Sequence, residues 1–197
     1  MSRPALVLGS TQRRSIVDDA ACASRGVEVA ARPSGGGVVF VDPVETLWVD
    51  VVLPVGDPLW VVDVGRSAAW LGDAWARALG ASGAVADPVV HEGSMCLSRW
   101  GRLVCFAGLG PGEVTAGPGG PKVVGISQRR TRAGARFQCA VPFAWDARSL
   151  AGLLTFESVD ERDAAVADLS APGVVHPVTA ATPQALLDAF LAELPAY

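Results

Sequence analysis

Short apolar runs, most of them rich in valine, recur along the first three quarters of the chain. Runs of this length, bounded by glycine, proline or charged residues, are typical of buried strands. They predict strands at residues 5–9, 27–30, 37–41, 46–54, 84–90, 102–110, 113–116, 122–130 and 135–142. Turn residues separate them, such as Asp42 and Pro43 after the third run and Gly134 between the last two.

A second pattern, with apolar residues three and four positions apart, predicts helices. It is clearest over residues 70–80. Another helix is predicted over 15–26, where acidic residues come first and Gly26 supplies the stop. The end of the chain predicts helices over 149–156, 160–169 and 182–194. Strands mixed irregularly with helices indicate an α+β fold, with a mixed or antiparallel central sheet and flanking helices.

The length and composition indicate the number of domains and the cellular compartment. The chain has 197 residues, 50% of them hydrophobic, which suits a single domain with a sizeable core. No apolar run reaches the length of about 18 residues that a membrane-spanning helix needs. The first residues also lack the basic region, apolar stretch and cleavage site of a signal peptide. We therefore expect a cytoplasmic protein with no membrane partner, whose oligomeric state the sequence leaves open.

The charge distribution excludes broad attraction to nucleic acid, because the net charge is −4. One local exception is a cluster of four arginines, Arg129, Arg130, Arg132 and Arg136. Such a cluster could hold nucleic-acid phosphates, but the only aromatic residue interleaved with it is Phe137. A solvated hairpin that docks an acidic acceptor or carrier domain is the favoured interpretation. Salt dependence of nucleic-acid binding would separate the two.

The cysteines and histidines do not indicate a metal site within the protein. None of the cysteines forms a C-x-x-C pair. They are Cys22, Cys96, Cys105 and Cys139, and the two histidines are His91 and His176. Reduced and mostly buried thiols are the simplest expectation.

Two glycine-rich segments are the candidates for chemistry. The first, "ARPSGGGVVFVD", has three glycines in a row, which permit positive φ and close approach of a ligand to the backbone. The second, "GPGGPKVVGISQRR", places Lys122 at the start of a buried strand. A lysine ammonium suits a phosphate or a developing oxyanion, and bare amides can approach the same anion. A plain turn and a solvated lysine are the simpler alternatives, and neither segment fits a phosphate-loop or dinucleotide motif.

Taken together, four segments resemble the biotin/lipoate protein ligase family, on its lipoate–protein ligase A side. They are "RPALVLGSTQ", "GVEVAARPSGGGVVFVD", "VVLP" and "VCFAGLGPGEVTAGPGGPKVVGISQRRTRAGARFQCAVPF". The family pattern is Arg-Arg-x-Ser-Gly-Gly-Gly-Ala-Val, followed after about 90 residues by Gly-x-Lys-Ile-x-Gly-x-Ala-Gln. The resemblance covers about residues 4–143 of a single domain spanning 1–197 and leaves the helical part, about 148–197, outside it.

The resemblance implies a ligase fold and an acyl-transfer activity. In that family an acyl-adenylate is made from ATP, with magnesium, and lipoate or octanoate, and the acyl group passes to a lysine of an acceptor domain. Lys122 would be the catalytic residue. The residues that would bind the substrate or adenylate are Arg32, Ser34, Gly35, Gly36, Gly37, Gly125 and Ser127. Biotin is the less favoured acid, because the Ser-Gly-Gly-Gly pattern is closer to the lipoate side.

Departures from the family pattern keep two alternatives open. Ala31 replaces the first arginine, and Val41 stands where a histidine usually precedes the aspartate. One alternative is an ATP-independent octanoyltransferase that uses a cysteine thioester at Cys139, although the apolar neighbours of that residue favour a buried strand position. The other is a non-catalytic member that binds an acyl or nucleotide ligand, or a lipoyl-domain partner.

Overall fold

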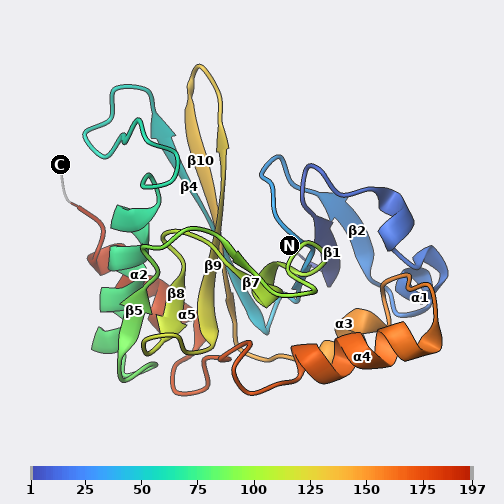
Figure 1. Ribbon diagram of the computed structural model, residues 1–197. Coiled ribbons are helices and arrows are strands. Elements are labelled where there is room, and N and C mark those ends of the chain that lie inside the picture. Colours follow the sequence, from blue (N-terminus) through green and yellow to red (C-terminus); the bar gives the residue numbers. More distant parts are fainter. Residues whose placement is uncertain (1, 196–197) are drawn as a thin grey trace.

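The computed structural model describes residues 2–195. Its larger sheet has five strands in the order β4-β10-β9-β8-β5, each antiparallel to its neighbours (Figure 1). These strands are β4 (Thr46–Pro54), β5 (Pro88–Val90), β8 (Val114–Ala116), β9 (Lys122–Arg130) and β10 (Gly134–Pro142). β9 and β10 form a long hairpin, and β10 also pairs along its length with β4.

A smaller sheet lies beside the larger one (Figure 1). Its central strand, β1 (Ala5–Leu8), runs parallel to β2 (Glu28–Ala31) and antiparallel to β3 (Val39–Val41). Around it lie η1 (Arg14–Ile16), α1 (Asp19–Ser24), α3 (Ala147–Ala151) and α4 (Val159–Leu169). Leu6 and Leu8 of β1 share a buried cluster with residues of α3 and α4, so the C-terminal helices complete this second core.

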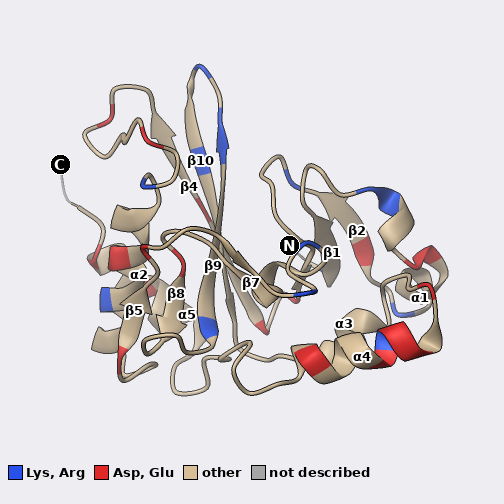
Figure 2. Ribbon diagram, in the orientation of Figure 1, with Lys and Arg blue, Asp and Glu red and all other residues tan. Residues whose placement is uncertain are grey.

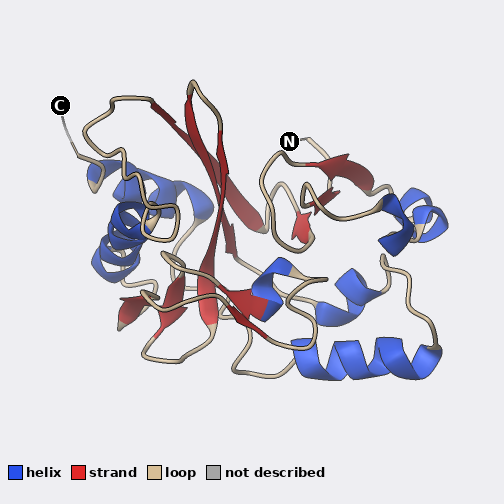
Figure 3. Ribbon diagram, turned by 45° about the horizontal axis from the view of Figure 1, so that its top comes forward, coloured by secondary structure: helices blue, strands red, loops and turns tan. Residues whose placement is uncertain are grey.

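One face of the larger sheet is covered by α2 (Ala69–Ala81) and α5 (Pro183–Ala192), as Figure 3 shows. Trp75 of α2 stacks on Phe190 of α5 with ring centroids 3.9 Å apart. Phe137 and Cys139 of β10 are buried in the same cluster. Successive strand residues point to opposite faces. Their neighbours Arg136 and Gln138 therefore belong to the other face, on the side of the smaller sheet.

The long elements agree with the sequence pattern. The strands predicted at 46–54 and 122–130 have those bounds, and β10 begins one residue before its predicted start at 135. The helix predicted over 70–80 spans Ala69–Ala81. No helix in the part of the chain that the structure describes combines the length and the apolar character needed to cross a bilayer.

The strand predicted over 102–110 is wrong. The segment forms a 3₁₀ helix, η2 (Cys105–Ala107), and then β7 (Gly108–Leu109), which pairs with β6 (Cys96–Leu97). Val104 and Ala107 are buried in one cluster and Phe106 in another. An apolar run that is buried on several sides resembles a buried strand, because periodicity cannot separate the two.

Two predicted helices have different bounds. α1 begins at Asp19 instead of residue 15, because the side chain of Asp18 accepts a hydrogen bond from the amide of Ala21 and caps the helix there. The helix predicted over 149–156 is the shorter α3, which starts after Asp146 and ends at Ala151.

Candidate active site

The glycine segment 35–37 packs tightly against the backbone of two other segments. Gly36 has φ of +96°. A Cβ on Gly9 would lie 2.0 Å from the carbonyl oxygen of Gly36, and a Cβ on Gly37 would lie 2.6 Å from the amide nitrogen of Cys105. Side chains at these positions would collide with backbone, which cannot move aside cheaply. At Gly9 and Gly37 the glycines therefore permit close approach of the chain to itself.

Arg32 holds this segment in place. Its guanidinium donates to the carbonyls of Val7 at 3.2 Å, Gly35 at 2.9 Å and Gly37 at 2.7 Å. The residue is only 4% exposed, and burial lowers the pKa of the guanidinium from its ordinary value. Three of its five N–H donors therefore hold the loop, whereas its buried Nε has no hydrogen-bond partner among the described residues.

Ser34 joins the glycine segment to the larger sheet. Its hydroxyl lies 2.9 Å from that of Ser127 on β9 and donates to Oε1 of Gln138 on β10 at 2.7 Å. The amide of Gln138 in turn donates to Asp50 of β4 at 3.2 Å. This chain of hydrogen bonds crosses three strands and fixes the distance between the two sheets at the site.

Lys122 is the buried cation of the site. It is 4% exposed, and its Nζ lies 2.7 Å from Oε2 of Glu113. The same Nζ donates to the carbonyls of Cys105 and Gly108, both at 3.0 Å, and lies 5.2 Å from the centroid of the Phe106 ring. An ammonium has three donor hydrogens. Lys122 therefore already has an acceptor for each of them.

Glu113 is the functional residue that sequence reasoning missed. One carboxylate oxygen accepts from the amide of Gly110 at 2.6 Å, and the other accepts from the amide of Ile126 at 3.0 Å. The carboxylate thus joins Lys122 to the turn before β8 and to the middle of β9. Its place beside Lys122 could have been inferred by pairing the predicted strands 113–116 and 122–130 across the glycine turn, because that pairing brings residues 113 and 122 together.

Two cavities meet at Lys122. The first, of about 360 Å³, lies between the glycine segment and the start of α2. Its walls include Gly35, Gly36, Gly37, Val64, Ala68, Met95, Cys105, Glu113, Lys122, Ile126 and Ser127. The second, of about 380 Å³, includes Thr115, Trp100 and Asp168 and shares Lys122, Leu97 and Gly108 with the first. The walls of both are mostly apolar, which is usual for small-molecule sites.

The structure brings most of the predicted site residues together. Ser34, the three glycines, Ser127 and Lys122 all line or border the first cavity. Gly125 lies under the lysine stem, since a Cβ there would be 3.3 Å from Cε of Lys122. Arg32 lies behind the glycine segment, where it binds carbonyls.

Cys139 is not part of this group. It is fully buried on the opposite face of the sheet, in the cluster with Trp75, and burial raises the pKa of its thiol to about 12. The half-buried Cys105 is among the residues that line the first cavity, and its carbonyl accepts from Lys122. Its position in a wrongly predicted strand hid it from sequence reasoning.

A buried lysine beside a fixed glycine segment, between an antiparallel and a mixed sheet, agrees with the ligase family that the sequence resembles. The model of the lipoyl protein ligase A/B catalytic domain matches residues 1–191, so the chain belongs to that family. A comparison with curated protein sequences gives no match. The assignment therefore rests on the family model and on structural similarity.

Solved structures with the same fold include lipoate–protein ligases. A bipartite lipoate protein ligase from Thermoplasma acidophilum, described with its E2 lipoyl domain, has a TM-score of 0.73 and 18% identity. Lipoate-protein ligase A bound with ATP has a TM-score of 0.65 and 16% identity, and P. falciparum LipL1 in complex with lipoate has 0.64 and 13%. Each covers 97% of this chain, which spans 66%, 67% and 46% of theirs.

Proposed function

We propose that this protein transfers a lipoyl or octanoyl group to a lysine of an acceptor domain. The observation that carries the proposal is the buried Lys122 at the junction of two largely apolar cavities, beside the glycine segment. An acyl carbonyl that replaces one of the two backbone carbonyls bound to Nζ would meet a buried cation. Such a donor stabilises the negative charge that develops on the carbonyl oxygen during acyl transfer.

The first route proceeds through an acyl-adenylate, with ATP and magnesium as substrates. The acid's carboxylate attacks the α-phosphorus of ATP and displaces pyrophosphate. The acceptor amine then attacks the acyl carbonyl, AMP leaves with the bonding electron pair, and the amine loses a proton as the amide forms. Support for this route comes from neighbours described with lipoate and with ATP. In this chain the donors to the acyl phosphate would be the amides of residues 35–37 and Lys122, which must first give up one of its backbone carbonyls.

A specific observation favours a second route through a thioester at Cys105. Cys105 is one of the residues that line the cavity, and its backbone lies against Gly37 and Lys122. The Cys105 thiolate would attack an acyl thioester on a carrier and release the carrier thiol. The acceptor amine would then attack the Cys105 thioester and release the cysteine. This route needs no triphosphate site, which matters because Arg32 is bound to carbonyls and Glu113 places a negative charge beside Lys122.

Mass spectrometry separates the routes. The protein would be incubated with ATP, magnesium and lipoate or octanoate, and separately with an octanoyl carrier protein. A released or bound acyl-adenylate supports the first route. An octanoyl mass increase on the peptide that carries Cys105, absent in Cys105→Ser and retained in Cys139→Ser, supports the second. If the folded protein gives neither product but still binds the acid or a lipoyl domain, acyl transfer is refuted and a binding role replaces it.

A further inference from the structure

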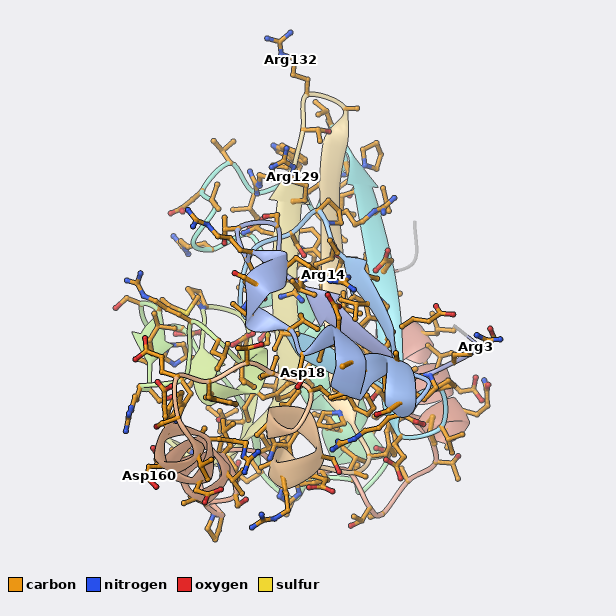
Figure 4. The ribbon with its side chains drawn as sticks, turned by 90° about the vertical axis from the view of Figure 1, so that its right-hand side faces the viewer. Arg3, Arg14, Asp18, Arg129, Arg132 and Asp160 are labelled. Carbon is orange, nitrogen blue, oxygen red and sulfur yellow. The ribbon has the colours of Figure 1, made fainter. Side chains whose placement is uncertain are left out.

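The outer end of the β9–β10 hairpin carries a basic surface, which we call the hairpin face and define by Val52, Arg129, Arg132 and Arg136. Figure 2 shows the positive residues gathered at this end, and Figure 4 shows Arg132 projecting beyond the tip. Arg129 and Arg136 are direct partners in the strand register, so their side chains leave the sheet on the same side. Like charges directly opposite each other destabilise an antiparallel pair.

Neighbouring acids compensate only part of this charge. Asp50 lies 3.8 Å from Arg136, with both side chains widely exposed to solvent. Among residues 2–195, Arg129 and Arg132 form no ion pair. The chain as a whole is acidic, with a net charge of −4, so this surface is a local reversal of its charge. A locally reversed, uncompensated patch is complementary to an acidic partner.

The hairpin face also has an apolar centre. Val52 of β4, opposite Arg136, is 61% exposed. With Pro33, Arg129 and Arg136 it lines a hollow of about 310 Å³. Apolar contact area with arginines around it is typical of a protein interface. Single-stranded nucleic acid would instead call for aromatic side chains on which bases stack, and the hollow has none in its lining.

The hairpin face adjoins the candidate active site. Pro33 in the hollow precedes Ser34, which is bound to Ser127 at the edge of the first cavity. Arg129 follows Ser127 by two residues on the same face of β9, a separation of about 7 Å along a strand. An extended lysine side chain from a partner seated on the hairpin face therefore spans the distance to Ser127, which lines the first cavity.

We propose that the hairpin face docks an acidic protein domain carrying the acceptor lysine and directs that lysine past Ser34 and Ser127. The inference rests on the proposed acyl transfer and deepens it by locating the partner. The charges of Arg129 and Arg132 supply orientation and association rate, and Val52 supplies apolar contact. Neither arginine touches the buried network around Lys122, so docking and chemistry can be measured apart.

The test compares Arg129→Glu/Arg132→Glu with a control of equal charge change, Arg148→Glu/Arg162→Glu, which changes arginines on α3 and α4. The probe is an apo lipoyl domain of the E2 type, and its binding is measured by calorimetry without acyl donor. We expect the double variant to bind at least about tenfold more weakly and the control to bind like the wild type. Replacing acidic residues of the probe by lysine should restore binding to the double variant.

Acyl-adenylate or acyl-cysteine formation, measured in the same variants, should remain at the wild-type level. Equal affinity of the double variant and the wild type overturns the docking proposal. The docking proposal is also overturned if the wild type binds a single-stranded oligonucleotide but not the domain, and the double variant no longer binds the oligonucleotide. Domain binding that depends on the hairpin face without any acyl transfer refutes the proposed function and leaves docking intact. If acyl transfer to the domain proceeds at the wild-type rate in the double variant, the docking proposal is refuted and the proposed function stands.

Discussion

The two ends of the β9–β10 hairpin differ in how their polar side chains are treated. At the inner end, Lys122, Ser127 and Gln138 each have close partners, and the lysine is buried. At the outer end, Arg129 and Arg136 face each other in water with a single acid nearby. Chemistry needs groups held in place before the substrate arrives. A docking surface binds a partner of opposite charge more strongly when its own charges are unpaired, because the partner then supplies the opposite charges.

The largest expected effect comes from removing the inner cation. We expect Lys122→Ala to slow acyl transfer by at least about a thousandfold, because the acyl oxygen loses its donor. It should also lower the free energy of unfolding by about 3 kcal/mol, since Glu113 is left buried without its partner. Mass spectrometry of the acceptor and urea denaturation measure the two effects.

A second variant separates folding from chemistry. Lys122→Met with Glu113→Gln removes both charges, so it should regain much of the stability that Lys122→Ala loses while staying inactive. Transfer at the wild-type rate in either variant would remove Lys122 from the mechanism.

Substitution within the glycine segment should have the next largest effect. Gly37→Ala puts a Cβ 2.6 Å from the backbone at Val104 and Cys105, and we expect a loss of about 2 kcal/mol from overpacking. Gly35→Ala is the matched control, because a Cβ there meets nothing within 4 Å. Thermal denaturation of the pair tests this. Equal melting temperatures would show that the segment is not fixed against residues 104–105.

The two thiols of the hairpin and cavity should differ in reactivity. At pH 8, iodoacetamide should modify Cys105 at least about a hundredfold faster than Cys139, whose raised pKa leaves almost no thiolate. Peptide mapping gives both rates, and unfolding in denaturant should make them similar. Because the pKa of Cys139 is higher in the folded state, its contribution to stability is full below pH 9 and is lost as the pH rises toward 12. Rapid labelling of Cys139 in the folded protein would contradict its burial.

The smallest expected effect lies outside both ends of the hairpin. Asp146 caps α3, and its hydrogen bonds from the side chain and then the backbone of Ser149 lower the pKa of the carboxyl group. Asp146→Ala should cost about 1 kcal/mol near neutral pH. The difference in the free energy of unfolding should shrink as the pH falls below 3.8, the ordinary pKa, and vanish below the lowered pKa of the folded state. The carboxyl group is then protonated in both states, so its ionisation no longer stabilises the fold. Asp160→Ala, in the first turn of α4, should cost only a few tenths of a kcal/mol.

The sequence predicted the regular parts of the site because their periodicity is strong. β9 carries Lys122 at its first residue, as its apolar run indicates, and the antiparallel return of β10 follows from the turn at Gly134. The resemblance to the ligase family supplied the relation between the glycine segment and Lys122. The family model over residues 1–191 confirms membership of the family.

The parts that failed depend on tertiary packing that no local pattern encodes. The run 102–110 is apolar because it is buried against two clusters, not because it alternates as a strand. That error hid Cys105, whereas Cys139 was the cysteine considered as a nucleophile, although its apolar neighbours already favoured burial. Glu113 is acidic in a glycine-rich loop, where a solvated position is the ordinary expectation. Only the pairing of β8 with β9 shows that it is buried beside Lys122.

The tight packing of Gly37 against residues 104–105 lies where the two sheets are connected through the backbone. Val38, the residue before β3, accepts a hydrogen bond from the amide of Cys105, whose own carbonyl accepts from Lys122 on the larger sheet. The backbone of one residue, Cys105, thus connects the two halves of the molecule. A ligand that draws Lys122 away from that carbonyl loosens the seam between the sheets. The amide hydrogen of Cys105 should therefore exchange with solvent faster when a ligand fills the cavity.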